Sequence, residues 1–120
     1  MAQVLALVDD LFFQAKILET AKHAGVEVLV CSTVGALICE MAKAPPQLVV
    51  IDLNARGRPI EALTQIRSGA QKAPVVAFLS HVQTDLAAQA RAAGCNEVMP
   101  RSQFARDLAT ILGRAKSESS

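Results

Sequence analysis

The sequence predicts one doubly wound α/β domain, in which helices cover both faces of a five-stranded parallel sheet. Apolar runs of strand length alternate with helix-length amphipathic segments five times along the 120 residues. The apolar runs lack the apolar–polar alternation of half-exposed strands, as is typical of parallel strands buried on both faces. Right-handed crossovers between such units favour the strand order 2-1-3-4-5.

The elements follow from the local pattern of side chains. Five apolar runs, rich in β-branched residues, are expected to be strands: residues 4–8, 26–31, 48–52, 74–79 and 97–99. Five intervening segments with apolar side chains at helical spacing are expected to be helices: residues 11–24, 33–44, 59–68, 84–93 and 103–112.

Glycine, proline and serine mark the ends of several helices. Gly25 supplies a stop for the first helix, and Ser32 is expected to cap the second. Pro45 forbids continuation of the second helix, whereas Pro59 fits the first turn of the third. Ser102 is expected to cap the last helix, which is expected to be continuous.

Length and composition indicate one globular domain at residues 1–115, followed by a disordered polar tail at residues 116–120. A hydrophobic content of 52% can fill a core, and a formal net charge of +1 argues against binding to nucleic acid. Neither a membrane span nor a signal peptide is recognisable, so a cytoplasmic protein is expected. Cys31, Cys39 and Cys95 lack metal or dithiol spacing and are expected to be reduced packing residues.

Carboxylates follow two of the buried runs. Asp9 and Asp10 come after the first run, and Asp52 ends the third. With the predicted strand order these two strands are neighbours, so their carboxyl ends and the three side chains should meet at one edge of the sheet. Three clustered carboxylates need a cation or a proton, which makes a hard-cation site the favoured interpretation. The alternative is that they are solvated strand ends or helix caps.

These residues resemble those of the receiver domains of bacterial response regulators, over almost the whole chain. The resemblance implies that Asp9 and Asp10 help to hold Mg²⁺ and that Asp52 is the phosphoacceptor and a further metal ligand. It also places Asn54 where the family lends a backbone carbonyl to the metal. In the family the acceptor carboxylate attacks a phosphohistidine of a sensor kinase, and the metal neutralises charge.

Three positions depart from the family pattern. The usual threonine or serine falls on Leu79, and Ser80, one residue later, should point elsewhere. The phosphate-pairing lysine falls on Arg101, which keeps the charge but replaces a compact ammonium by a planar fork. Arg101 is expected to pair with Asp52 or its phosphoryl group; otherwise it is a surface cation. The aromatic switch position falls on Val98, so conventional output signalling is in doubt.

Other polar residues near the predicted site are weaker candidates. Arg56 and Arg58 are expected to solvate their loop, although one of them could fold over the carboxylates and replace the metal. His81 follows the fourth strand and is expected at the surface or behind the site rather than on a metal. His23 lies late in the first predicted helix, away from the site.

The resemblance implies a single-domain receiver that accepts a phosphoryl group on Asp52 and signals through protein contacts. The alternative is a pseudo-receiver that binds a protein without being phosphorylated. The expected partners are a sensor histidine kinase or phosphotransfer protein and a downstream protein, and a homodimer is left open. An enzyme is not expected, because no phosphate-binding glycine loop and no nucleophile–base arrangement is recognisable.

Overall fold

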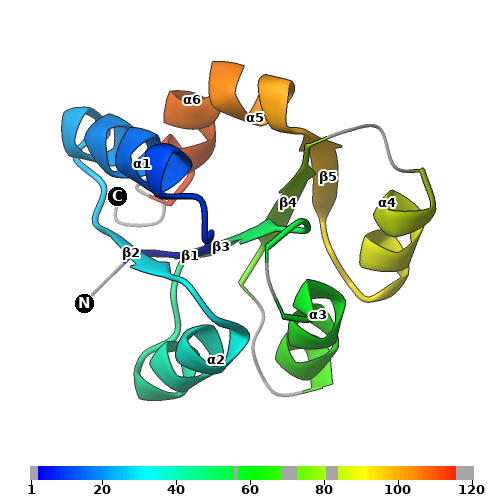
Figure 1. The fold of residues 1–120 in the computed structure, drawn as a ribbon. Helices are drawn as coiled ribbons and strands as arrows, with labels where there is room; N and C mark the ends of the chain where they lie inside the picture. The colour runs from blue at the N-terminus through cyan, green and yellow to red at the C-terminus, as the bar shows by residue number, and fades with distance from the viewer. Residues whose placement is uncertain (1–2, 56, 69–72, 81–83, 116–120) are drawn as a thin grey trace.

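The computed structural model describes residues 3–55, 57–68, 73–80 and 84–115. Strands and helices alternate along the chain until two helices follow one another at its end (Figure 1). The strands are β1 (Val4–Leu7), β2 (Val28–Cys31), β3 (Leu48–Asp52), β4 (Val75–Leu79) and β5 (Glu97–Pro100). The helices are α1 (Leu11–Ala24), α2 (Val34–Lys43), α3 (Pro59–Ser68), α4 (Thr84–Ala92), α5 (Arg101–Arg106) and α6 (Leu108–Gly113).

All five strands are parallel and lie in the order β2-β1-β3-β4-β5, which confirms the predicted fold and strand order. Every residue of β1, β3 and β4 is buried, because helices cover these strands on both faces. β2 and β5 form the two edges of the sheet, and each has one buried residue, Cys31 in β2 and Met99 in β5. The continuous apolar runs of the sequence are therefore the interior of the sheet.

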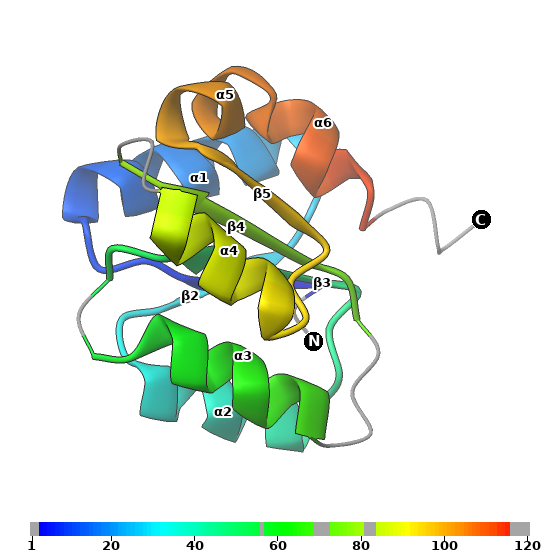
Figure 2. The same ribbon diagram turned by 90° about the vertical axis from the view of Figure 1, so that its right-hand side faces the viewer.

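The helices form two layers, and each layer covers one face of the sheet. Figure 2 shows α1, α5 and α6 on one side and α2, α3 and α4 on the other. The first layer encloses a cluster of three aromatic rings, in which Phe78 stacks on Phe104 with 4.5 Å between ring centroids and Phe13 lies 5.0 Å from Phe78. No helix among the described residues is long and apolar enough to cross a bilayer.

Most of the predicted helix ends are confirmed. Gly25 adopts the left-handed conformation (φ 70°), and its amide donates to the last turn of α1. The third helix begins at Pro59, and the second ends at Lys43, before Pro45. The predicted tail at residues 116–120 lies outside the described residues.

Two predicted caps are wrong. Thr33 rather than Ser32 caps α2, because its hydroxyl accepts from the Ala36 amide while the Ser32 hydroxyl accepts from Gln14. Ser102 lies inside α5, which begins at Arg101 directly after β5 and has no side-chain cap.

The last helix is not continuous as predicted, because the chain leaves helical geometry at Asp107 (φ −100°, ψ 11°) and divides into α5 and α6. Phe104 and Leu108, on either side of this break, are both buried in the core. The second strand also begins later than predicted, at Val28. The amide of Val26 instead donates to the Ala21 carbonyl at the end of α1.

Candidate functional site

The topology brings the predicted carboxylates to the carboxyl edge of the sheet. β1 pairs with β3, with Leu7 opposite Ile51, so the segment that follows β1 lies beside the end of β3. We call Asp9, Asp10 and Asp52 the acidic site. Asp52 is the last residue of β3 and the only buried charged residue among those described, with 1% exposure.

Both oxygens of the Asp52 carboxylate are engaged. Oδ1 accepts a hydrogen bond from the Asn54 amide at 2.9 Å, within the turn that follows β3. Oδ2 faces the Arg101 guanidinium, with 3.5 Å to Nη2. The buried carboxylate is thus held by a backbone amide at one oxygen and by a cation at the other.

Asp10 has two roles. Its Oδ1 caps α1 by accepting from the amides of Phe12 and Phe13, at 3.0 and 3.3 Å. Its Oδ2 accepts from Arg101 Nη1 at 3.1 Å. The Phe13 amide and Arg101 lower the pKa of Asp10. The helix-cap alternative is therefore correct for this residue, and the same side chain also belongs to the acidic site.

Arg101 joins the two carboxylates. It is the first residue of α5, and its guanidinium carbon lies 4.9 Å from the centre of the Phe13 ring and 5.7 Å from that of Phe78. Two aromatic side chains thus support the planar cation, a contact favourable by about 0.5–2 kcal/mol. The Nε atom is buried without a hydrogen-bond partner, so the terminal nitrogens make both ion pairs.

The expected pair between Arg101 and Asp52 is present, whereas its second pair with Asp10 was not anticipated. The support from Phe13 and Phe78 was missed as well, because these residues are distant from Arg101 in sequence. A signal for the role of Asp10 did exist: an aspartate directly before a predicted helix is a common N-cap.

The carboxylates do not fit a divalent cation in this arrangement. Among the described residues, no group of three or more carboxylate, histidine or cysteine side chains could hold a metal ion. All four oxygens of Asp10 and Asp52 accept hydrogen bonds, and the guanidinium lies between the two carboxylates. The positive charge between these two carboxylates is thus supplied by the guanidinium.

Asn54 and Ser80 link the loop that follows β3 to the loop that follows β4. The Asn54 side-chain oxygen accepts from the Ser80 amide at 2.6 Å and from the Ser80 hydroxyl at 2.8 Å. The Ser80 hydroxyl therefore bonds Asn54. This agrees with the expectation that Ser80 does not take the place of the threonine or serine hydroxyl that is absent at position 79. This role of the Asn54 side chain was not predicted, because the contact depends on the pairing of β3 with β4.

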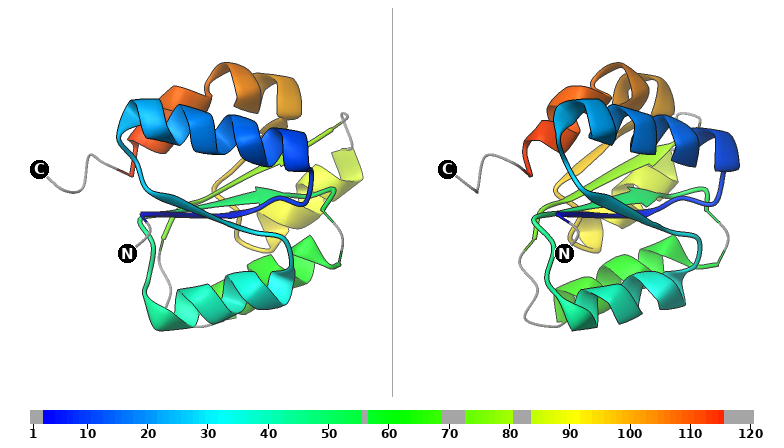
Figure 3. Two further views of the ribbon diagram at one scale, coloured as in Figure 1. Left: turned by 60° about the vertical axis from the view of Figure 1, so that its left-hand side comes forward. Right: turned by 90° about the vertical axis from the view of Figure 1, so that its left-hand side faces the viewer.

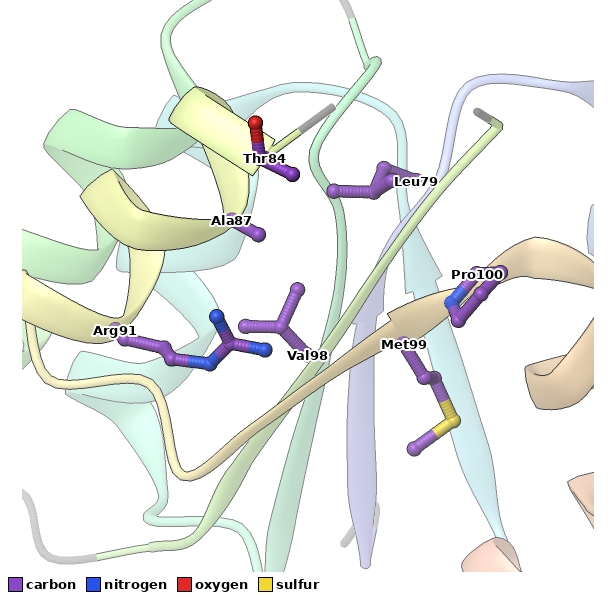
Figure 4. Close-up of a pocket in the computed structure, with 7 residues that line it drawn as sticks. All are labelled: Leu79, Thr84, Ala87, Arg91, Val98, Met99 and Pro100. Atoms are coloured by element: carbon purple, nitrogen blue, oxygen red, sulfur yellow. The ribbon is translucent and has the colours of Figure 1, made fainter. Parts of the chain in front are cut away.

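The residues at the two switch positions line a cavity of about 190 Å³ between α4 and β5. Leu79 and Val98 point into it, with the Arg91 guanidinium at one end (Figure 4). Thr84, Ala87, Met99 and Pro100 complete its lining. The cavity is apolar where the family pattern places a hydroxyl and an aromatic ring.

The remaining candidates are not brought to the acidic site or are not described. Arg58 pairs with Glu61 at 2.9 Å on the surface, as a loop-solvating residue should. His23 pairs with Glu19 on the exposed face of α1. Arg56 and His81 lie outside the described residues.

Burial raises the pKa of Asp52, and the negative charges of Asp9 and Asp10 raise it further. The Asn54 amide and Arg101 act in the opposite direction without cancelling the effect of burial. When a carboxyl has a higher pKa in the folded state than in the unfolded chain, its ionisation destabilises the folded protein. Asp52 therefore lowers the free energy of unfolding as pH rises from its unfolded pKa, about 3.9, through its higher folded value.

We expect the Asp52→Asn variant to gain stability relative to the parent as pH rises from about 3.5 to about 7, because it removes this ionisation. Denaturant unfolding at both pH values measures the difference. Asp10→Asn is the control, and the opposite effect is expected for it. The pKa of Asp10 is lowered, so ionisation of Asp10 stabilises the folded parent. The variant lacks this ionisation and should lose stability relative to the parent as pH rises. A difference between Asp52→Asn and the parent that does not change with pH would show that Asp52 titrates normally.

Solved structures of similar fold are receiver domains. Chemotaxis response regulator CheY4 of Vibrio cholerae superposes with a TM-score of 0.83 over 96% of this chain and 98% of that chain, at 20% identity. The chain has the fold of a response-regulator receiver domain. No protein-family model matches the sequence, and no curated protein matches it significantly.

Two further receiver-fold structures are relevant to the acidic site. The phosphorylated cyanobacterial phytochrome response regulator RcpA has a TM-score of 0.79 and 18% identity, covering 94% of this chain and 90% of that one. The Mn²⁺-bound form of response regulator Rcp1 has a TM-score of 0.75 and 20% identity, covering 95% of this chain and 91% of that one. At these identities the likeness concerns the fold.

Proposed function

We propose that this receiver-fold chain is a signalling module that acts through protein contacts, without phosphorylation of Asp52. This is the pseudo-receiver alternative of the sequence analysis. The observation that supports it is the guanidinium of Arg101, which pairs with Asp10 and Asp52 at once. It occupies the position between the carboxylates that a charge-neutralising cation would need.

The burial of Asp52 supports the same proposal. Phosphoryl transfer requires an acceptor oxygen that can approach phosphorus in line with the leaving group, together with positive charge around the transferring oxygens. The Asp52 side chain is 2% exposed, and both of its oxygens already accept hydrogen bonds. Burial raises the pKa of Asp52, in keeping with a carboxyl held inside the protein rather than presented to a reaction partner.

The two switch positions support it as well. Leu79 has no hydroxyl to move toward a phosphoryl oxygen, and Val98 has no ring that could take two positions. A ligand shifts a conformational equilibrium only through contacts that differ between the two states. A module without these contacts presents one constant surface to its partner.

A second candidate function is phosphorylation of Asp52 by a sensor histidine kinase or phosphotransfer protein in a bacterial cytoplasm. Mg²⁺ would then be held by Asp9, Asp10, Asp52 and the backbone carbonyl of Asn54. The specific observation in its favour is that the Arg101 side chain is 31% exposed, so the guanidinium can turn into solvent and free the carboxylates. RcpA and Rcp1 show that the fold is compatible with phosphorylation and Mn²⁺ in those proteins.

Acetyl phosphate with Mg²⁺ distinguishes the two functions, with incorporation read by intact-protein mass spectrometry. We expect no phosphoryl group on the unmodified protein and none on Asp52→Asn, the matched control. Arg101→Lys tests the closing role of the guanidinium, because lysine keeps the charge but cannot bridge both carboxylates with one planar fork. Incorporation into the unmodified protein that disappears in Asp52→Asn would overturn the proposal in favour of the second candidate.

A further inference from the structure

The cavity between α4 and β5 shares no residue with the acidic site. It lies at the end of the sheet opposite β2, and both views of Figure 3 look onto the β2 edge, with α4 behind the strands. One wall is the face of α4 that carries Thr84, Ala87 and Arg91, which are spaced at i, i+3 and i+7. The other wall is formed by Leu79 at the end of β4 and Val98 of β5.

The cavity exists because short side chains face each other across it. The methyl group of Ala87 projects from the helix toward the side chain of Val98 on the strand (Figure 4). The volume of about 190 Å³ is roughly six times the share of one water molecule in the liquid. An apolar cavity of about 150 Å³ is large enough for benzene. The space therefore suits a ligand of about one six-membered ring, whereas drug-sized ligands occupy about 300 Å³ or more.

The inner lining of the cavity is poor in hydrogen-bonding groups. The side chains of Leu79, Val98 and Pro100 have none, and Thr84 turns its methyl group rather than its hydroxyl toward Leu79 (Figure 4). A water molecule inside a protein typically makes about three hydrogen bonds. Water in this space would lack such partners, so an apolar group is the better occupant.

Arg91 is the one charged side chain among the described residues that line the cavity, and its guanidinium lies at one end (Figure 4). Within the part of the chain that the structure describes, this guanidinium makes no ion pair and no hydrogen bond. Ala87 and Ala88, one turn earlier on the same helix, carry no charge. Glu97, the acid of β5, pairs with Arg114. The end of the cavity thus presents a cation that no described carboxylate neutralises.

A second guanidinium lies near the same end. Burial raises the pKa of Cys95, whereas backbone hydrogen bonds and the positive charges of Arg67 and Arg91 lower it, so both cations lie close to this thiol. Arg67 is fixed there, because it donates to the Gly94 carbonyl at 3.0 Å and to Asn96 Oδ1 at 2.7 Å. An anion bound beside Arg91 would therefore be attracted by two positive charges.

We propose that the cavity binds a small monocarboxylate whose apolar body is about the size of one six-membered ring. The apolar body would replace water between α4 and β5, and the carboxylate would accept hydrogen bonds from the Arg91 guanidinium. A carboxylate suits this cation because its two oxygens match the planar fork of arginine. Inorganic phosphate could pair with Arg91 but would leave the apolar space unfilled. Binding requires neither a metal nor phosphorylation of Asp52.

An NMR titration of the full chain with sodium benzoate tests the proposal. We expect saturable shifts of the amides of Leu79, Ala87 and Val98, which lie on the three elements around the cavity. Benzamide has nearly the same shape without the charge, and its Kd should be at least about tenfold higher, because charge-assisted hydrogen bonds are about twice as strong as neutral ones. Inorganic phosphate should likewise bind more weakly than benzoate.

Two variants, each with a matched control, locate the site. Arg91→Met removes the charge from an exposed residue and should raise the Kd of benzoate at least about tenfold. Arg106→Met, which makes the same change at an exposed arginine paired with Asp107, should leave the Kd unchanged. Ala87→Leu should abolish binding by filling the cavity, whereas Ala88→Leu, at the exposed neighbouring position, should not. Far-UV circular dichroism checks that each variant is folded.

Three results would overturn the proposal. The first is the absence of saturable shifts up to the solubility limit of benzoate. The second is equal affinity for benzoate and benzamide, or for benzoate and phosphate. The third is a Kd in folded Arg91→Met equal to that of the parent, a result that remains readable even if Ala87→Leu does not fold. Asp52→Asn should bind benzoate like the parent, so failure of this proposal is distinguishable from failure of the proposed function.

Discussion

Replacing Arg101 by alanine is expected to lower the free energy of unfolding by about 2–4 kcal/mol at neutral pH. Removing one partner from a buried ion pair costs about 3–5 kcal/mol, because the remaining charge is left without compensation. We place the value lower because the Arg101 side chain is 31% exposed and because Asp52 can take up a proton when its partner is gone. Loss of the contacts with Phe13 and Phe78 adds to the cost.

The double variant Arg101→Ala, Asp52→Asn separates the ion pair from packing. If an uncompensated Asp52 charge causes the loss, the amide should restore a large part of the stability, as measured by denaturant unfolding at neutral pH. Lowering the pH below the pKa of Asp52 should restore the single variant in the same way, since the charge is then removed by protonation. Equal stability of Arg101→Ala and the parent would show that the guanidinium contributes nothing to holding the acidic site.

Replacing Phe78 by alanine is expected to cost about 3–5 kcal/mol, the range for removing a large aromatic side chain from a core. Phe78 is fully buried and lies between the other two rings of the aromatic cluster. It also lies beneath the guanidinium of Arg101, so the cavity would loosen the cation as well as the core. Phe78→Ala should therefore weaken the pairing of Arg101 with Asp52, seen as a higher pKa of Asp52 by carboxyl-carbon NMR.

Phe12→Ala is the matched control for this substitution. Phe12 is 92% exposed, and surface substitutions usually change stability by no more than about 0.5 kcal/mol. The comparison thus holds the chemical change constant and varies only burial. Similar losses in the two variants would contradict the position of Phe78 in the core. An Asp52 pKa equal to that of the parent in a destabilised Phe78→Ala would show that the ring does not influence the acidic site.

The pattern of apolar runs determined most of the fold. Val49, Val50 and Ile51 show no alternation, which required a strand buried on both faces, and the repetition of such runs required parallel strands with crossovers. Asp52 follows this run, so its place at the carboxyl edge of the sheet was predictable. The receiver resemblance was predictable for the same reason, because it depends on acids at the ends of particular strands.

At some helix ends the sequence offers two possible capping residues, and contacts with other parts of the chain decide between them. Ser32 and Thr33 are both good N-caps, and Gln14, from a distant helix, bonds Ser32 and leaves Thr33 to cap α2. In the same way, core packing of Phe104 and Leu108 accompanies a break at Asp107 that no proline or glycine announces. Propensity gives two near-equal choices in such places, and tertiary contacts select one.

Only the tertiary structure decided how the acidic site is closed and which surface is left open. A positive charge at position 101 was expected near Asp52, but the long side chain has many rotamers. Its actual direction depends on Phe13 of α1 and Phe78 of β4, which the fold places beside the start of α5. The apolar run of β2 looks like that of a buried strand in the sequence, and its open side follows from its position at the end of the sheet. Short-range patterns determine which segments are strands and helices, whereas contacts between distant segments determine where a flexible side chain points and which strand remains unpaired.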